Sequence, residues 1–208
     1  MRTFVGIPFK NRPDLLERAK ACVPLDLVDL EIVDNSGGGD GDFASYSYSQ
    51  SMAYFQWVCV EENGHTPFWL FMHSDGVAQR QDFVRLIEMA EALNKEGRKW
   101  AVIFTHHDVL ACYNTAALAD IGGWDTVFPD YFSDNHNYRK LRLKGYKMLL
   151  LENHTVEHGE NGKGSQTINS DPHLRRQNEI LFPAYAQLYR EMWGGNPGEE
   201  KFNAPWNK

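Results

Sequence analysis

Apolar and polar residues follow one another along the chain in short blocks that predict strands and helices in alternation. Five large apolar residues in a row, Phe68–Met72, predict a short strand buried on both faces, as in a parallel sheet. Further β-rich runs predict strands at residues 3–7, 27–33, 100–104, 109–113 and 146–151. Apolar residues at helical spacing predict helices at residues 13–22, 45–61, 82–95, 114–121, 133–143 and from Asp171 onward, with Leu143 and Ile180 among the inward-facing positions. This alternation predicts an α/β fold in which a mainly parallel sheet lies between two layers of helices, as a three-layer sandwich.

Two glycine-containing segments interrupt the pattern. Residues 37–42 are so rich in glycine that we expect a flexible loop, and residues 161–170 are rich in Gly, Ser and Asn, which is typical of a mobile lid. The sequence contains no internal repeat and no linker, so we expect residues 1–194 to form a single domain. Residues 195–208 are polar with two prolines, and we expect them to lie on the surface or to be disordered.

Composition limits the classes of function only modestly. The 208 residues carry a net charge of -7, which argues against a broad nucleic-acid-binding surface but leaves room for a local basic patch. The three cysteines, Cys22, Cys59 and Cys112, are too scattered for a metal site or a disulfide framework and are expected in the core. We find no signal-peptide pattern and no apolar run of membrane-spanning length, so the expected location is cytoplasmic.

The residues that follow the Phe68–Met72 strand are the first candidates for chemistry. His73 and Asp75 lie where ligands bind in open α/β sheets, beyond the carboxyl end of a strand. An imidazole and a carboxylate on either side of a small residue can share one divalent cation, and such a cation can neutralise a diphosphate. Asp75 and Gly76 also form a favourable turn dipeptide, and for this short segment alone a turn is the simpler explanation.

Four segments in order give the chain a likeness to a known family. They are Val5–Arg12, Leu30–Ser36, Phe71–Asp75 and Ile121–Tyr146. Their motifs and spacing resemble the family-two glycosyltransferases of GT-A fold: Pro-x-x-Asn-Arg after the first strand, Asp-Asn-Ser after the second, an Asp-x-Asp metal motif, and an acceptor-side pattern Gly-Gly-Phe-Asp … Glu-Asp … Arg-Leu-x-x-Gly-Tyr. The resemblance covers most of residues 3–160. It implies a GT-A-like, Rossmann-like fold and a metal-dependent, inverting transfer of a sugar from a nucleotide-diphospho-sugar to an acceptor hydroxyl.

The resemblance also assigns residues to donor binding. Asp34 would accept a hydrogen bond from the base, which mildly favours uracil and hence a UDP-sugar, and Arg12 would hold a phosphate through two hydrogen bonds. The structural alternatives are a helix cap at Asn11 or Asp14, a turn at Asp34 and a core position for Trp124. The residues assigned to donor binding are Pro8, Asn11, Arg12, Asp34, Asn35, Ser36, Ser74, Trp124 and Asp125.

For the metal, the resemblance implies Asp75, His73 and a further histidine after the last strand of the sheet. His158 fits that place, and His154 is a close competitor. The expected cation is Mn²⁺ or Mg²⁺, and the imidazole ligands favour Mn²⁺. The chain departs from the family pattern here, because His73 replaces the first Asp of Asp-x-Asp, which weakens the compensation of the cation's charge.

The resemblance places the catalytic base at Asp134, near the start of a helix. That carboxylate would take the proton of the acceptor hydroxyl, although a carboxylate in a first helical turn also stabilises the helix. We expect Asp34, Asp75 and Asp134 to face one cavity. The His106–Asp108 cluster also has the composition of a metal site, but a turn between two strands at the opposite end of the sheet explains it as well, and we leave it out of the site.

Two other functions remain open from the sequence. A nucleotidyltransferase would use similar phosphate chemistry, but the glycines expected directly after its first strand are missing. A catalytically weakened nucleotide-sugar-binding protein of the same fold is suggested by His73 and by Ser133, which replaces the first acid of Glu-Asp. The acceptor could be a glycan, a protein side chain or a modified base. We expect residues 128–131, residues 161–170 and the last helix to line its site.

Overall fold

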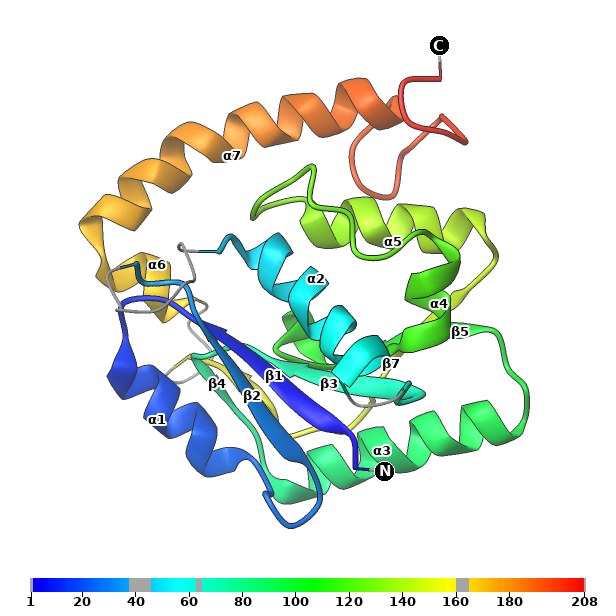
Figure 1. Ribbon diagram of the computed structural model, residues 1–208. Coiled ribbons are helices and arrows are strands. Elements are labelled where there is room, and N and C mark those ends of the chain that lie inside the picture. Colours follow the sequence, from blue (N-terminus) through cyan, green and yellow to red (C-terminus); the bar gives the residue numbers. More distant parts are fainter. Residues whose placement is uncertain (1, 38–45, 63–64, 160–164, 208) are drawn as a thin grey trace.

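The structure is a computed structural model that describes residues 2–37, 46–62, 65–159 and 165–207. Most of the predicted loop at 37–42 and residues 161–164 of the predicted lid lie outside these described residues. The main sheet contains six strands: β1 (Phe4–Phe9), β2 (Asp29–Asp34), β3 (Phe68–Met72), β5 (Trp100–Phe104), β6 (Leu110–Asn114) and β7 (Lys147–Leu150). Their order across the sheet is β2-β1-β3-β6-β5-β7 (Figure 1). Two short strands, β4 (Gly76–Val77) and β8 (Glu157–His158), form a separate antiparallel pair.

The sheet is mainly parallel, as predicted, and β6 is its antiparallel strand. Only residues 105–109 separate β5 from β6, and so short a connection can close a hairpin but cannot make the crossover that a parallel pair needs. Met72 at the carboxyl end of β3 therefore pairs with Leu110 at the start of β6. The interpretation of the His106–Asp108 turn as lying at the opposite end of the sheet is wrong, because this register puts the turn at the same edge as Asp75.

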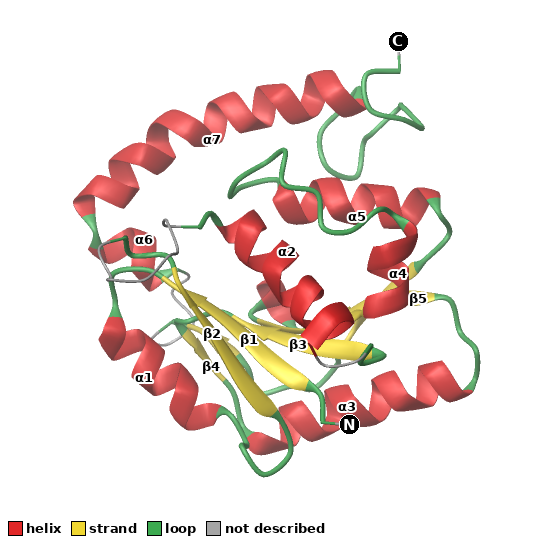
Figure 2. Ribbon diagram, in the orientation of Figure 1, coloured by secondary structure: helices red, strands yellow, loops and turns green. Residues whose placement is uncertain are grey.

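Helices cover both faces of the sheet (Figure 2). They are α1 (Pro13–Cys22), α2 (Tyr48–Trp57) with a π-helical turn at Val58–Glu62, α3 (Arg80–Lys95), α4 (Thr115–Asp120), α5 (Ser133–Leu143), α6 (Gln166–Ser170) and α7 (Pro172–Trp193). A 3₁₀ turn, η2, spans His106–Asp108. The predicted helices and strands are thus present, with ends that differ by a few residues.

The β3 strand shows how the three layers are held together. All five of its side chains are buried, and they alternate between the two faces of the sheet. Leu70 and Met72 belong to the core under α1 and α3, whereas Trp69 and Phe71 belong to the core under α2, α4 and α5. The run of apolar residues is continuous because both faces are covered.

Polar side chains fix where several helices begin. The Ser47 hydroxyl accepts a hydrogen bond from the Gln50 N–H at the start of α2, and the Gln50 side chain accepts one from the Ser47 N–H. Asp171 caps α7 by accepting hydrogen bonds from the backbone N–H groups of His173 and Leu174. These caps satisfy donors that the first turn of a helix leaves unpaired.

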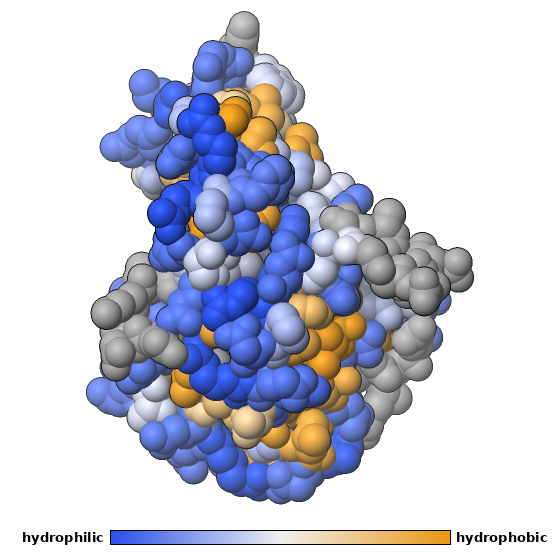
Figure 3. Space-filling model, turned by 90° about the vertical axis from the view of Figure 1, so that its left-hand side faces the viewer, coloured by the Kyte–Doolittle hydropathy of each residue, from blue (hydrophilic) through white to orange (hydrophobic). Residues whose placement is uncertain are grey.

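α7 crosses the molecule above α2 and α5 (Figure 1). Its last two turns pack through Tyr189, Met192 and Trp193 against Phe128, in a small separate core. Residues 195–207 turn back on this end, where the N–H of Phe202 donates to Trp193 O. At the height of α7, the face shown in Figure 3 is mainly hydrophilic, with hydrophobic atoms gathered along one side.

Two inward-facing expectations are wrong. Leu143 is 38% exposed and Ile180 is 56% exposed. Leu143 is the last residue of α5, beyond the turns that pack on the sheet. Ile180 lies in the part of α7 that precedes the buried segment at Tyr189–Trp193, where packing covers only one side of the helix. In the part of the chain that the structure describes, no helix combines the length and the apolar character that a bilayer crossing would need.

Gly6 in the middle of β1 lets α2 approach the sheet. A Cβ atom on Gly6 would lie 2.7 Å from Cγ of the Phe55 ring, inside the contact distance of carbon atoms. We therefore expect Gly6→Ala to lower the free energy of unfolding by about 1–3 kcal/mol, as measured by urea denaturation. Combining it with Phe55→Leu, which removes the ring, should recover part of the loss. An unchanged denaturation midpoint in the single variant would contradict the close approach.

Candidate functional site

A cavity of about 640 Å³ opens at the carboxyl edge of the main sheet. Its volume is within the usual range for small-molecule sites. Strand ends and the following turns form its floor, and the start of α5 together with α6 and α7 forms its sides. The lining residues of the floor and of the α5 side that concern the predicted site are Pro8, Asn35, His73, Ser74, Asp75, Asp108, Asp134 and His158.

A cluster of side chains of the kinds that bind metal ions lies in this cavity. One ligand atom from each of His73, Asp75 and His158 lies within 4.8 Å of the other two. His158 Nε2 is 3.3 Å from Asp75 Oδ1. His73 and Asp75 come from the end of β3, and the β4–β8 pair brings His158 to them by placing it opposite Gly76. The cluster therefore depends on a pairing between segments that are far apart in the sequence.

Gly76 is required by the tight turn that follows Asp75. A Cβ atom there would lie 2.8 Å from a methyl carbon of Val109 and 3.1 Å from His73 O. The turn is closed by hydrogen bonds from Gly76 N to His73 O and from Gly159 N to Asp75 O. The Asp75–Gly76 dipeptide thus makes the expected turn and also points Asp75 into the cluster.

The protonation states in the cluster suit a divalent cation. Burial lowers the pKa of His73 to about 4, so its imidazole is neutral at neutral pH. Burial raises the pKa of Asp75, but hydrogen bonding to His158, the nearby imidazoles and the Gln166 N–H together outweigh burial and bring it to about 2. An ionised carboxylate beside a neutral imidazole is the form in which both groups bind metals. The donor set fits Mn²⁺, for which mixed oxygen and imidazole ligands are suitable.

Asp134 faces the same cavity from the first turn of α5. Burial raises the pKa of its carboxyl group, and hydrogen bonds from backbone N–H groups offset only part of that effect. Phe132, directly before α5, has the left-handed backbone angle φ 67°, which turns the chain sharply into the helix. Asp134 is thus a partly buried carboxylate that binds protons more readily than an ordinary aspartate.

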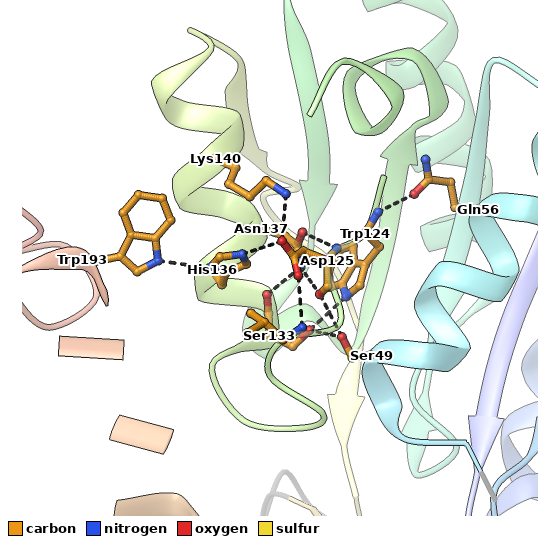
Figure 4. Close-up of polar contacts among 10 residues, drawn as sticks. Ser49, Gln56, Trp124, Asp125, Ser133, His136, Asn137, Lys140 and Trp193 are labelled. Atoms are coloured by element: carbon orange, nitrogen blue, oxygen red, sulfur yellow. Dashed lines mark hydrogen bonds and ion pairs between the residues drawn. The ribbon is translucent and has the colours of Figure 1, made fainter. Parts of the chain in front are cut away.

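A network of polar contacts behind α5 fixes the position of its first turn (Figure 4). Ser133 Oγ lies 2.9 Å from Ser49 Oγ and accepts a hydrogen bond from Trp124 Nε1 at 2.9 Å. Asn137 Nδ2 donates to Ser133 O and to Asp125 O. These contacts link α2, the Trp124–Asp125 turn and α5, so that Asp134 is held on a rigid support.

Trp124 and Asp125, two predicted donor residues, belong to this network and do not line the cavity. Trp124 is buried in the core. The Asp125 carboxylate lies 3.1 Å from His136 Nε2 and 3.2 Å from Lys140 Nζ (Figure 4). Both residues therefore contribute to the position of α5.

His136 should make the stability of the protein depend on pH. Trp193 Nε1 donates to His136 Nδ1 at 3.1 Å, so the ring proton of neutral His136 is on Nε2, facing Asp125. Burial lowers the pKa of His136 below 6.5, although Asp125 acts in the opposite direction. The unfolded chain therefore binds a proton more readily, and the stability that is present above the ordinary histidine pKa is lost as the pH falls below it.

We expect the free energy of unfolding to fall between about pH 7 and pH 5 more steeply in the wild type than in His136→Gln, by up to about 1.4 kcal/mol per pH unit. Urea denaturation at a series of pH values measures both slopes. His73 contributes in the same direction in both proteins, so the difference between the slopes isolates His136. Equal slopes would show that His136 titrates alike in the folded and unfolded chain.

The site residues predicted at the ends of β1 and β2 do not all line the cavity. Pro8 and Asn35 line the cavity. Asp34 is exposed and does not line it, because its Oδ1 accepts a hydrogen bond from Ser36 N at 2.8 Å and so closes the turn after β2. The structure thus brings Asp75 and Asp134 to one cavity, but not Asp34.

Asn11, Arg12 and Ser36 also lie outside the lining. Asn11 N donates to Ser36 Oγ at 2.8 Å. Arg12 forms two hydrogen bonds with the Asp14 carboxylate and a third with Ser170 Oγ. In this structure these residues join the loop after β1 to the turn after β2 and to α6.

Asp108 and Tyr48 are among the cavity residues that the sequence interpretation left out. Asp108 lies at the cavity because β5 and β6 form an antiparallel hairpin, and the five-residue connection between them could have indicated this. The Tyr48 ring is stacked on His73, with 6.3 Å between the ring centroids. Of the two competing histidines, His158 lies with His73 and Asp75, whereas His154 Nε2 accepts a hydrogen bond from His106 N.

Comparisons with known proteins found similar structures but no match by sequence. No family model and no curated protein matches the sequence. Residues 1–349 of S. aureus TarS align with a TM-score of 0.50 and 11% identity, over 74% of this chain and 58% of that one. A second structure of S. aureus TarS aligns with a TM-score of 0.53 and 11% identity, over 74% of this chain and 35% of that one.

A third solved structure, Drosophila β-1,4-galactosyltransferase 7 with manganese, UDP-Gal and xylobiose, has a TM-score of 0.48 and 9% identity, over 78% of this chain and 69% of that one. That likeness is too low to bear on the chemistry of this chain. The TarS structures are of the GT-A type, and this chain spans 58% and 35% of their lengths. The predicted α/β fold is confirmed: the chain has a GT-A-type fold, with a mainly parallel six-stranded sheet flanked by helices.

Proposed function

We propose that this protein is a metal-dependent, inverting glycosyltransferase that moves a sugar from a nucleotide-diphospho-sugar to an acceptor hydroxyl. One observation carries the proposal: a metal-ligating cluster, His73–Asp75–His158, and a carboxylate with a raised pKa, Asp134, face one cavity at the carboxyl edge of the sheet. The GT-A-type fold adds support, since sugar-nucleotide chemistry in this fold is what the sequence resemblance implies.

The metal-ligating cluster is the proposed place of the donor diphosphate. His73, Asp75 and His158 would hold Mn²⁺ or Mg²⁺, which when bound neutralises negative charge on the diphosphate. Lys10 lines the cavity and adds a second positive charge at the end of β1. Arg12 would need to leave Asp14 to reach a phosphate, so Lys10 is the better candidate for this contact. Pro8 and Asn35 border the proposed base, for which uracil is our preferred identity.

Asp134 is the proposed general base. As the acceptor oxygen bonds to the anomeric carbon, the bond from that carbon to the diphosphate oxygen breaks, and the acceptor proton passes to the Asp134 carboxylate. The products are the glycosylated acceptor and a nucleoside diphosphate. A single direct displacement of this kind inverts the anomeric carbon. The raised pKa makes Asp134 a stronger base than an exposed aspartate.

A thermal-shift screen of nucleoside diphosphates and their sugars, with and without Mn²⁺, tests the donor site. Ligand binding raises the apparent stability, and we expect the largest rise with a UDP-sugar and Mn²⁺ together. Release of UDP from the same mixtures tests turnover. If no nucleotide-sugar changes the melting temperature and none is consumed, the proposal fails.

A binding protein of the same fold is the second candidate. It is favoured by the presence of only one carboxylate in the metal-ligating cluster, and by Ser133, which is buried in the network behind α5. Binding of a nucleotide-sugar without hydrolysis or transfer, across a range of acceptors, would support this second candidate.

A further inference from the structure

Besides Asp75 and Asp134, the carboxyl groups of Asp108 and Asp130 line the cavity, and the proposed mechanism uses neither. Asp130 Oδ1 accepts a hydrogen bond from Tyr48 N, at the start of α2. Asp108 lies at the end of the η2 turn and lines the cavity together with Asp134. Its backbone angle φ is 53°, in the left-handed region. The turn therefore holds Asp108 in a backbone conformation that most residues avoid but that Asn and Asp tolerate.

A chain of tyrosine hydroxyls ends at Asp108. Tyr138 OH donates to Asp108 Oδ2 at 2.7 Å and lies 3.0 Å from Tyr113 OH. Both tyrosines are buried. These contacts fix one oxygen of the carboxyl group. Within the part of the chain that the structure describes, the other oxygen, Oδ1, has no hydrogen-bond partner.

The surroundings of Asp108 and Asp134 indicate that a ligand binds between them. Burial raises the pKa of Asp108, and the charge of Asp134 raises it further, against the Tyr138 hydrogen bond, to about 6. Keeping two partly buried carboxyl groups around one cavity costs stability unless a further partner binds them. Such an arrangement is typical of binding and catalytic sites.

Aromatic rings from α7 and from the segment before α5 also line the cavity. The Phe182 ring of α7 makes an edge-to-face contact with Tyr131, with 5.1 Å between centroids, and lies 5.4 Å from the Phe132 ring. Phe182 is 45% exposed and lines the cavity. A cavity lined by both acidic groups and aromatic rings matches a pyranose, which has hydroxyl groups at its edge and C–H groups on its faces.

We propose that Asp108 is a substrate-binding residue and that the acceptor is a sugar, with one hydroxyl facing Asp134 and a second hydroxyl donating to Asp108 Oδ1. The proposal rests on the proposed function for the role of Asp134. An acceptor with a single hydroxyl and no further donor, such as 1-propanol, would leave Asp108 Oδ1 without a partner from the substrate. Sites built to bind a hydroxyl discriminate strongly against analogues that lack it.

The test compares small acceptors in UDP-sugar turnover with Mn²⁺. Methyl glucopyranosides and galactopyranosides offer several hydroxyls, whereas N-acetylserinamide and 1-propanol offer one. We expect the glycosides to stimulate UDP release and the single-hydroxyl compounds to leave it at the rate in water. Stimulation by N-acetylserinamide equal to that by the glycosides would overturn the proposal.

Asp108→Asn removes the charge with little risk to the fold, because Asn tolerates a positive φ and can still accept the Tyr138 hydrogen bond. We expect the KM for the glycoside to rise about tenfold or more, since a hydrogen bond to a charged group is lost. In the wild type, the glycoside KM should rise as the pH falls below about 6, where Asp108 becomes protonated, and this dependence should be absent in the variant. Asp120→Asn on the exposed end of α4 is the matched control and should behave as the wild type.

Failure of this proposal is distinct from failure of the proposed function. Stimulated UDP release with an unchanged KM in Asp108→Asn overturns only the role of Asp108. If the wild type consumes no nucleotide-sugar, saturation-transfer NMR of methyl glycosides with the protein, UDP and Mn²⁺ still measures acceptor binding. Glycoside binding that weakens in Asp108→Asn but not in Asp120→Asn supports the site, and equal binding in all three proteins overturns it.

Discussion

Asp75→Ala will abolish the Mn²⁺-dependent rise in melting temperature and reduce nucleotide-sugar turnover by at least about a hundredfold. Asp75 is the carboxylate of the metal-ligating cluster, and the two imidazoles left behind would supply no negative charge. The measurement is the melting temperature with and without Mn²⁺, in the presence and absence of UDP. The quantity compared is the change in melting temperature on adding Mn²⁺, not the melting temperature itself. Asp75 Oδ2 also accepts a hydrogen bond from Gln166 N, and loss of that bond alone lowers the stability.

Two further variants separate metal binding from folding. Asp75→Asn keeps an acceptor for the Gln166 N–H but removes the charge, so it should fold well and still lose most of the Mn²⁺ effect. Asp120→Ala removes an exposed carboxylate outside the cavity and should keep the full effect. A full Mn²⁺ shift in Asp75→Ala would remove this residue from the metal site.

The elements that the sequence predicted best are those set by local patterns. The apolar run Phe68–Met72 is long enough for one strand and too apolar for a sheet with an open face, and β3 has these bounds. The position of His73 and Asp75 at the sheet edge follows directly from the end of that strand. His158 could be named only through the family likeness, because no spacing rule relates residues 73 and 158, which the β4–β8 pair brings together.

The side chains hardest to predict were those that form hydrogen bonds with residues close by in the sequence. Asp34 and Arg12 are close in sequence to residues that line the cavity. In the structure, however, Asp34 accepts a hydrogen bond from Ser36 N, and Arg12 donates to the Asp14 carboxylate. Each of these partners is two residues away in the sequence. Such local hydrogen bonds compete with ligand contacts and leave no trace in the hydrophobic pattern. Trp124 was equally ambiguous, since a large aromatic side chain suits both a sugar site and a core.

Asp134→Asn should keep donor binding and lose transfer. The amide has the shape of the carboxylate, and Ser133 and Asn137 hold the first turn of α5 through contacts that do not involve residue 134. A UDP-sugar with Mn²⁺ should therefore raise the melting temperature as in the wild type. An amide cannot take the acceptor proton, so we expect UDP release to fall by about a hundredfold to ten-thousandfold.

The pH dependence distinguishes a base from a residue that only positions α5. Because burial raises the pKa of Asp134, the wild-type rate should fall with decreasing pH from a point above the ordinary value of 3.8, as the carboxylate becomes protonated. The residual rate of Asp134→Asn should lack that fall, and Asp120→Asn should retain it. Wild-type turnover in Asp134→Asn would discard the base, whereas a lost rate with an unchanged pH profile would indicate that Asp134 acts through the position of α5. Since Asp75 and Asp134 face one cavity from different elements, the two variants together separate donor binding from proton transfer.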